Sequence, residues 1–297
     1  MEDIVFDKRF HDLVDKQELW KAGDGFGFTE GPLFLPTGYI IFSDILREEI
    51  IRYCPPFWFG KERTNTGGAN GNTLDLQGRL ISCEGTLKRL TRREHDGSIT
   101  VLADSYNGRP LNAPNDVVIK SDGSIYFTDP YFMGPEEQWL APSLASQDTC
   151  GVYRLSVTGR LDRLIGDIAK PNGLAFSSDE KLLYVVNSAD NCVYAFDVQA
   201  DGAVANKRLW LAMKHNLEGI GDGMKVDTLG NAYVTGPGGV WVADKTGKAL
   251  GILRVPNVCT NLAFYGWDCK LLFITTPPAV YVSKLKVSGI SVLDRIR

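Results

Sequence analysis

Six polar residues recur along the chain, each after a small or turn-forming residue and each followed by a short apolar stretch. Their spacing is 39 to 57 residues, and they are Glu30, Asn70, Asn115, Asn172, Asp222 and Asn261. Carboxylates and amide carbonyls are hard oxygen donors, the ligands that a divalent cation such as Ca²⁺ prefers. If the fold gathers these side chains, they predict an oxygen-lined metal site.

Each of the six residues heads the same kind of phrase. An apolar-rich strand is followed by a turn built on Gly, Pro, Asp or Asn, and then by a second strand, as in "ANGNTLDLQGRLISCE" from Ala69. Further strands lie between the copies, for example "EIIRYC" at residues 49–54 and "GVYRLS" at residues 151–156. A period in the forties with about four strands per copy predicts an all-β fold, a six-bladed β-propeller of four-stranded antiparallel blades around a central channel.

The two ends of the chain are expected to close the ring. The sixth copy has room for only three strands before the C-terminus, whereas "KQELWKAG" near the N-terminus is strand-like and otherwise unpaired. We therefore expect residues near 17–21 to complete the last blade, which removes open sheet edges. Residues 1–16 are interpreted as an N-terminal arm, helical or loosely packed, and residues 17–297 as one propeller domain.

In a propeller the first strand of each blade lines the channel, so the six head residues are predicted to meet at one mouth of it. Asn and Asp also head strands simply because they favour turns. Six copies in register, two of them acidic in a buried funnel where unpaired charge is costly, favour a metal site. A cation there would polarise a carbonyl and acidify water. Asp222 is the candidate general base, because the Gly-rich turn "GIGDG" leaves room for a substrate.

The motifs "TEGP", "APNDV", "KPNGLAFS" and "GDGMKVD" follow one another along the chain. On these motifs the chain resembles the SMP-30/gluconolactonase/luciferin-regenerating-like family of metal-dependent propeller lactonases, over about residues 28–276. The resemblance implies the metal ligands Glu30, Asn115, Asn172 and Asp222. It also implies that Asp222 doubles as the catalytic acid/base, and it leaves Asn70 and Asn261 as hydrogen-bonding partners of the substrate or of the ligands.

A long loop is expected to cover the pocket. The segment from Asp129 to Gly151 is too long and too aromatic for an ordinary hairpin connection, and such loops commonly bind ligands. Its residues Tyr131, Phe132 and Met133 predict a partly apolar roof that contacts the substrate. The alternative is that they only pack over the edge of the propeller.

Two further positions bear on the substrate. His215 lies on the loop before Asp222 and is interpreted either as a substrate contact or as a surface histidine. The resemblance leads us to expect a polar residue where Gly85 stands. Since unpaired hydroxyl groups of a sugar lactone would be desolvated at a cost, the chain is expected to accept less polar lactones as well.

The composition of the chain bears on its expected binding partners and on its expected location in the cell. The formal net charge is −4, from 32 basic and 36 acidic side chains without long runs of one sign, so neither nucleic acid nor a membrane surface is expected as a partner. The charged N-terminus lacks the apolar core of a signal peptide, and no apolar run of about 18 residues occurs. The six cysteines are widely spaced and predicted to be free thiols, as in the cytoplasm.

The sequence therefore predicts a cytoplasmic hydrolase that opens a lactone with one bound divalent metal ion. Ca²⁺ is the first expectation, with Zn²⁺, Mg²⁺ and Mn²⁺ open. Two alternatives stay open: a phosphotriesterase-type hydrolase on the same site, and a metal-independent biosynthetic or binding propeller resembling the strictosidine-synthase relatives. The oligomeric state is not predicted.

Overall fold

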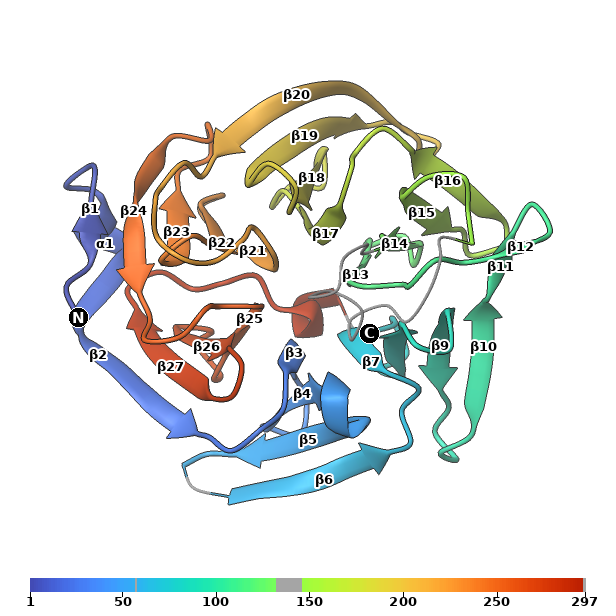
Figure 1. Ribbon diagram of the computed structural model, residues 1–297, viewed down its shortest axis with the longest axis horizontal. Helices are drawn as coiled ribbons and strands as arrows, with labels where there is room; N and C mark the ends of the chain where they lie inside the picture. Colours follow the sequence, from blue (N-terminus) through green and yellow to red (C-terminus); the bar gives the residue numbers. More distant parts are fainter. Residues whose placement is uncertain (57, 132–145, 296–297) are drawn as a thin grey trace.

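The structure is a computed structural model that describes residues 1–56, 58–131 and 146–295. Six small antiparallel sheets stand side by side in a ring around a central channel (Figure 1). Each sheet contributes four strands to this ring, and its strands follow one another from the channel outward. The prediction of a six-bladed β-propeller is thereby confirmed.

Each strand nearest the channel contains one of the six head residues or begins within two residues after one. They are β3 (Thr29–Phe34), β7 (Ala69–Leu74), β13 (Val117–Ile119), β17 (Pro171–Phe176), β21 (Met224–Val226) and β25 (Leu262–Tyr265). The second strands are β4 (Ile40–Asp44), β8 (Leu80–Glu84), β14 (Ile125–Asp129), β18 (Leu182–Asn187), β22 (Ala232–Gly236) and β26 (Leu271–Thr275). We number the blades 1 to 6 in this order.

The outer half of each blade is made by two more strands. The third strands are β5 (Glu49–Cys54), β9 (Arg89–Arg93), β15 (Gly151–Leu155), β19 (Cys192–Val198), β23 (Gly239–Ala243) and β27 (Val280–Leu285). The outermost strands are β6 (Trp58–Thr64), β10 (Ile99–Ala103), β16 (Leu161–Ile165), β20 (Val204–Ala212), β24 (Ala249–Arg254) and β2 (Val14–Gly23). A separate hairpin joins β11 (Ser105–Tyr106) to β12 (Arg109–Pro110).

The N-terminal segment closes the ring as predicted. Strand β2 pairs antiparallel with β27, so blade 6 takes its outermost strand from the other end of the chain. Before it, β1 (Ile4–Val5) adds a fifth strand to blade 5 by pairing with β24. The helix expected in this region is limited to the single turn α1 (Phe10–Leu13), because the chain turns into the β2 pairing directly after it. The domain boundary at residue 16 stays a prediction.

The hydrophobic core lies between the blades. Six apolar clusters are found, one at each interface between neighbouring blades. At the interface of blades 3 and 4, for example, Tyr126 and Val152 pack with Phe176 and Leu183, all buried. Burying one large apolar side chain contributes about 1.5–3 kcal/mol, so these interfaces stabilise the ring. The innermost strands are left to line the channel.

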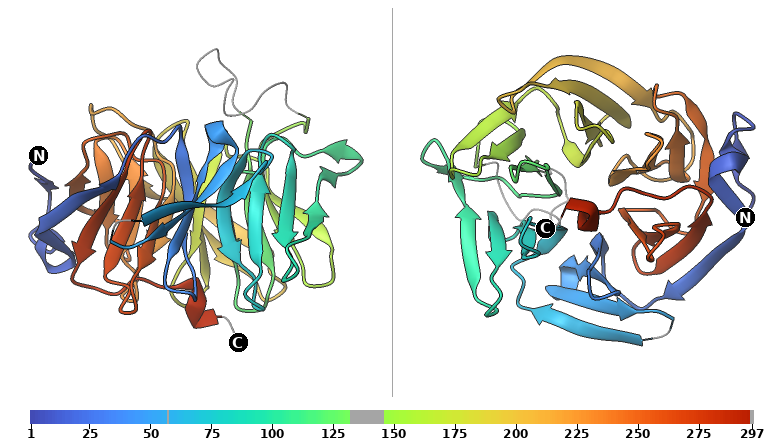
Figure 2. Two further views of the ribbon diagram at one scale, coloured as in Figure 1. Left: turned by 90° about the horizontal axis from the view of Figure 1, so that it is seen from below. Right: turned by 180° about the vertical axis from the view of Figure 1, so that it is seen from behind.

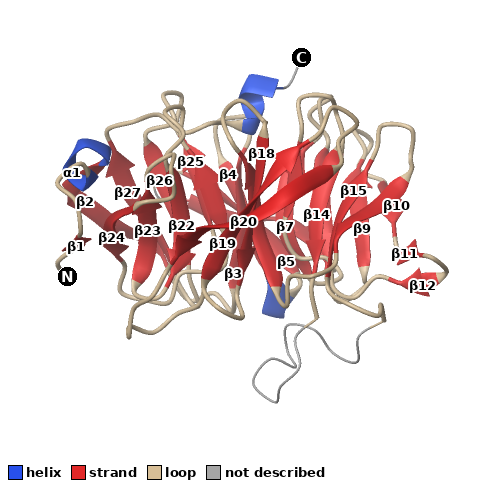
Figure 3. Cartoon of the chain, turned by 90° about the horizontal axis from the view of Figure 1, so that it is seen from above, coloured by secondary structure: helices blue, strands red, loops and turns tan. Residues whose placement is uncertain are grey.

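The two ends of the channel differ. The short helix η1 (Ile45–Arg47) follows β4 and so lies at the end where the innermost strands begin, whereas η2 (Val292–Arg295) lies at the opposite end (Figures 2 and 3). In Figure 1, η2 is seen near the axis of the ring. The head residues therefore face the mouth on the η1 side. Within the described ranges, no helix is long and apolar enough to cross a membrane.

Candidate metal centre

All six head residues are buried at one end of the channel, although every one of them is polar. Their exposed fractions lie between 2% and 8%, for Glu30, Asn70, Asn115, Asn172, Asp222 and Asn261. In three blades the β-ladder between the first and second strand shifts register next to the head residue, for example between Glu30 and Leu33 on β3. Such irregularities re-aim side chains at the rims of closed sheets.

Glycine allows the six strand ends to approach one another closely. A Cβ atom on Gly31 would lie 2.0 Å from the carbonyl oxygen of Asn70, and one on Gly173 would lie 2.2 Å from that of Asp222. The amide of Gly173 also donates to the carbonyl of Asp222 across 3.1 Å. A residue with a side chain would force these strands apart, so the pattern of a polar residue followed by Gly sets the small radius of the ring.

The carboxylate of Glu30 is held through one of its two oxygens. Its Oε2 accepts hydrogen bonds from the Gly31 amide at 2.6 Å and from Nδ2 of Asn261 at 2.8 Å. Oδ1 of Asn261 in turn accepts from the Leu262 amide at 2.8 Å. Since both donors found among the described residues reach Oε2, Oε1 of Glu30 is the oxygen left for a ligand.

Several buried oxygens in the ring have no hydrogen-bond partner among the described residues. They are Oδ1 of Asn70, Oδ1 of Asn172 and Oδ2 of Asp116. Leaving a buried acceptor unpaired costs about 1–3 kcal/mol, so native proteins rarely do so without a reason. A divalent cation with oxygen ligands satisfies such acceptors, and the residues present therefore fit a metal of the Ca²⁺ type.

The carboxylates repel one another. Burial raises the pKa of Glu30 to about 7, and the nearby Asp116 adds to the rise. Burial also raises the pKa of Asp222 well above its usual range, with further contributions from the charges of Glu30 and Asp116. Like charges in a poorly hydrated space disfavour ionisation. A bound cation would offset this repulsion and favour the ionised carboxylates.

Sequence reasoning missed Asp116, which belongs to this charge cluster. It is 3% exposed, its Oδ1 accepts from the Val117 amide at 2.9 Å, and burial raises its pKa. In blades 1, 2, 4 and 5 the head residue is followed by Gly, whereas in blade 3 Asp116 takes that place. This departure from the repeat was the signal available in the sequence.

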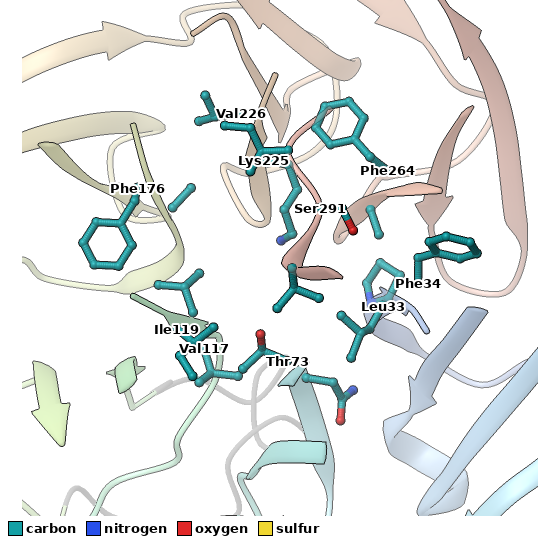
Figure 4. Close-up of a pocket in the computed structure, with 17 residues that line it drawn as sticks. Leu33, Phe34, Thr73, Val117, Ile119, Phe176, Lys225, Val226, Phe264 and Ser291 are labelled. Atoms are coloured by element: carbon teal, nitrogen blue, oxygen red, sulfur yellow. The ribbon is translucent and has the colours of Figure 1, made fainter. Parts of the chain in front are cut away.

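Lys225 was also missed. It lies on β21 and extends its amino group into a cavity of about 100 Å³ below the ring of head residues (Figure 4). The six innermost strands and Ile290 to Val292 line this cavity. The positive charge of Lys225 opposes the rise in pKa of both Glu30 and Asp116. Lys225 therefore places a positive charge in the channel close to the carboxylates.

Among the described residues, no three or more His, Cys, Asp or Glu side chains lie together in a way that could hold a metal ion. The candidate donor set is of a different kind, because half of its four residues are asparagines whose amide oxygens would serve as ligands. Such a set matches the preference of Ca²⁺ for mixed carboxylate and carbonyl oxygens.

A profile of the family described as SMP-30/Gluconolactonase/LRE-like region matches residues 28–277. The chain belongs to this SMP-30/gluconolactonase family. The resemblance read from the four motifs is thereby confirmed. The matched range runs from just before the first head residue to the end of β26, so it contains all six head residues.

The chain is similar to a gluconolactonase and to a regucalcin over most of its length. It is 27% identical to a gluconolactonase of Zymomonas mobilis over 288 residues, which covers 88% of this chain and 80% of the relative. It is 25% identical to regucalcin of Oryctolagus cuniculus, with 80% and 79% covered. The solved structure of a gluconolactonase from Xanthomonas campestris superposes with a TM-score of 0.87 at 30% identity, covering 96% of this chain and 95% of that one.

The loops of this SMP-30/gluconolactonase family member carry the remaining predicted contacts. His215 is exposed, and its Nδ1 accepts from the Leu217 amide at 3.3 Å. Tyr131 is partly buried, and its amide contacts the Cys150 sulfur at 3.4 Å. Phe132 and Met133 lie outside the described residues, so the apolar roof stays a prediction.

Gly85 is buried, and its amide donates to the Gly68 carbonyl at 3.0 Å. A Cβ atom there would meet nothing closer than 3.5 Å, at the carbonyl of Pro114. The position therefore has room for a side chain, unlike the glycines that follow the head residues.

Proposed function

We propose that the protein is a lactonase that opens a cyclic ester at the mouth of the channel, with one divalent cation, Ca²⁺, held by Glu30, Asn115, Asn172 and Asp222. The observation that carries the proposal is that Oδ1 of Asn172 has no partner in the described part of the chain and lies near two buried carboxylates whose pKa values are raised. The gluconolactonase relatives support a lactone as the substrate and favour it over the two alternatives.

The proposed chemistry divides between the cation and the chain. When bound, such a cation supplies Lewis-acid polarisation of the lactone carbonyl. Asp222 accepts the proton of the attacking water and returns it to the leaving alkoxide, and its buried setting gives the carboxylate an elevated proton affinity. Asn261 fixes Oε2 of Glu30, so that Glu30 acts as a ligand rather than as a second base.

Several of the remaining predictions concern the residues that surround the site. Asn70, whose Oδ1 has no partner among the described residues, is proposed to bind the substrate. His215, Tyr131, Phe132 and Met133 keep the same proposed role. The six cysteines are free thiols, as predicted, which is compatible with the cytoplasmic location that we propose.

The test is a panel assay of chelated protein supplied with defined metals. We expect turnover of gluconolactone and of a hydrophobic δ-lactone, with kcat/KM values within about tenfold, equivalent to 1.4 kcal/mol. A preference for gluconolactone of more than tenfold would contradict the predicted apolar roof, but it would not contradict the proposed lactonase activity. Turnover of an organophosphate triester without turnover of any lactone would overturn the proposed function.

A further inference from the structure

Ser188 joins the two ligand-bearing segments of blades 4 and 5. It directly follows β18 and is 7% exposed. Its Oγ donates to the carbonyl oxygen of Gly221 across 2.6 Å and accepts from Nδ2 of Asn172 across 3.0 Å. Gly221 immediately precedes Asp222. The Ser188 hydroxyl therefore contacts the side chain of the proposed ligand Asn172 and the backbone beside the proposed ligand Asp222.

The chemistry of these groups decides which way the Asn172 amide points. A carbonyl oxygen can only accept, so it takes the single hydroxyl proton of Ser188. The Ser188 oxygen can then only accept from Asn172, which places the NH₂ end of the amide toward Ser188. The Oδ1 end is turned the other way, where it is buried and has no partner among the described residues.

We infer that Ser188 is a positioning residue that presents Oδ1 of Asn172 to the metal. The inference rests on the proposed function and deepens it. It assigns the orientation of the Asn172 side chain to the hydroxyl group of Ser188, which directly follows the neighbouring strand β18.

A serine in blade 1 provides the comparison. Ser43, near the end of β4, donates to the carbonyl of Asn70 at 2.8 Å and accepts from Nδ2 of Asn72 at 2.9 Å. Oδ1 of Asn72, however, accepts from Oγ of Ser82 at 2.7 Å. The same two-bond arrangement thus holds a fully paired amide, that of Asn72 on β7 of blade 2, but leaves Oδ1 of Asn172 in blade 4 without a partner among the described residues. Only the blade 4 arrangement is built to hold a ligand.

The experiment measures Ca²⁺ binding to the chelated full-length protein by isothermal titration calorimetry. Ser188→Ala is expected to weaken the affinity at least tenfold, because the amide of Asn172 then loses the acceptor that fixes its orientation. Ser188→Thr keeps the hydroxyl and should stay within about threefold of the wild type. Ser43→Ala, which also removes a buried hydroxyl, should likewise stay within about threefold. Equal losses in Ser188→Ala and Ser43→Ala would overturn the inference.

A second measurement does not depend on metal. Thermal unfolding in excess chelator is compared for Ser188→Ala, Asn172→Ala and the double variant, with Ser188→Cys in place of Ser188→Ala if the alanine variant does not fold. The inference predicts that the sum of the two single shifts in Tm exceeds the shift of the double variant, since both single substitutions remove the same hydrogen bond. Additive shifts would overturn it. If the wild type binds no Ca²⁺, the proposed metal site is wrong. The comparison of the single and double variants still decides whether Ser188 orients Asn172.

Discussion

Asn261 donates from Nδ2 to Oε2 of Glu30 across 2.8 Å and thereby joins the last blade of the propeller to the first. The amide of Asn261 is itself fixed, because its Oδ1 accepts from the Leu262 amide. The contact that completes the ring at this end is therefore also a contact within the candidate site. In this arrangement Asn261 contacts Glu30, a proposed ligand, which corresponds to one of the two roles that the resemblance implied for it.

Replacing Asp222 with Asn tests the assignment of the general base. Asp222→Asn keeps the size of the side chain but removes its proton affinity, and we expect kcat to fall by about 10²- to 10⁴-fold. Circular dichroism should show the fold unchanged. The control is Glu218→Gln, an exposed carboxylate on the same loop, which should retain wild-type kcat. An Asp222→Asn variant with more than a tenth of wild-type activity would rule out this role.

The metal-free protein should lose stability as the pH rises. The pKa of Glu30 is about 7 in the folded chain, against 4.5 for an ordinary Glu. The contribution of Glu30 to the free energy of unfolding is therefore fully present below pH 4.5 and is lost as the pH rises through 7. From the difference in pKa, the loss by pH 8 is on the order of 3 kcal/mol. Tm measured in chelator should therefore fall between pH 5 and pH 8.

The control for this pH dependence is Glu30→Gln, which removes the titrating group. Its Tm should change less between pH 5 and pH 8 than that of the wild type. Adding Ca²⁺ should raise the Tm of the wild type more at pH 8 than at pH 5, because protons compete with the cation. A wild-type Tm that rises with pH in chelator would contradict the electrostatic account.

Much of this architecture could be predicted from the sequence because the repeat is local. Alternation of apolar residues and turn signals located strands such as β5, and the head residues follow from the same pattern. The pairing of β1 with β24 was not predicted, since a two-residue strand carries too little pattern. Ser188 and Lys225 escaped for another reason: their roles depend on partners in neighbouring blades or on the shape of the channel, and no local motif marks them.

Lys225 is expected to weaken metal binding. Its amino group points into the cavity of the channel (Figure 4). Its charge stabilises the ionised carboxylates of Glu30 and Asp116, so it also repels a bound divalent cation. Lys225→Met should raise Ca²⁺ affinity by about tenfold at low ionic strength, and Lys225→Arg should not. The matched control is Lys181→Met, whose side chain is 81% exposed. Weaker binding by Lys225→Met would show that the lysine has a different role.

The close approach of strand ends can be tested at a glycine. A Cβ atom on Gly173 would lie 2.2 Å from the Asp222 carbonyl, so Gly173→Ala should destabilise the protein by about 1–3 kcal/mol and weaken Ca²⁺ binding. Gly85→Ala is the matched control, since its nearest neighbour lies at 3.5 Å, and it should stay within about 0.5 kcal/mol. Denaturant unfolding measures both changes. Equal free energies of unfolding for the Gly173→Ala and Gly85→Ala variants would mean that the strand ends can move apart without cost.

The central claim is that lactone hydrolysis depends on a cation held by the oxygen atoms of Glu30, Asn115, Asn172 and Asp222. The most direct measurement is the rate of gluconolactone hydrolysis by thoroughly chelated protein as Ca²⁺ is added back. We expect the rate to fall to the uncatalysed background after chelation and to return as one Ca²⁺ binds per chain. Full activity in the chelated protein, with no response to added metal, would contradict the account.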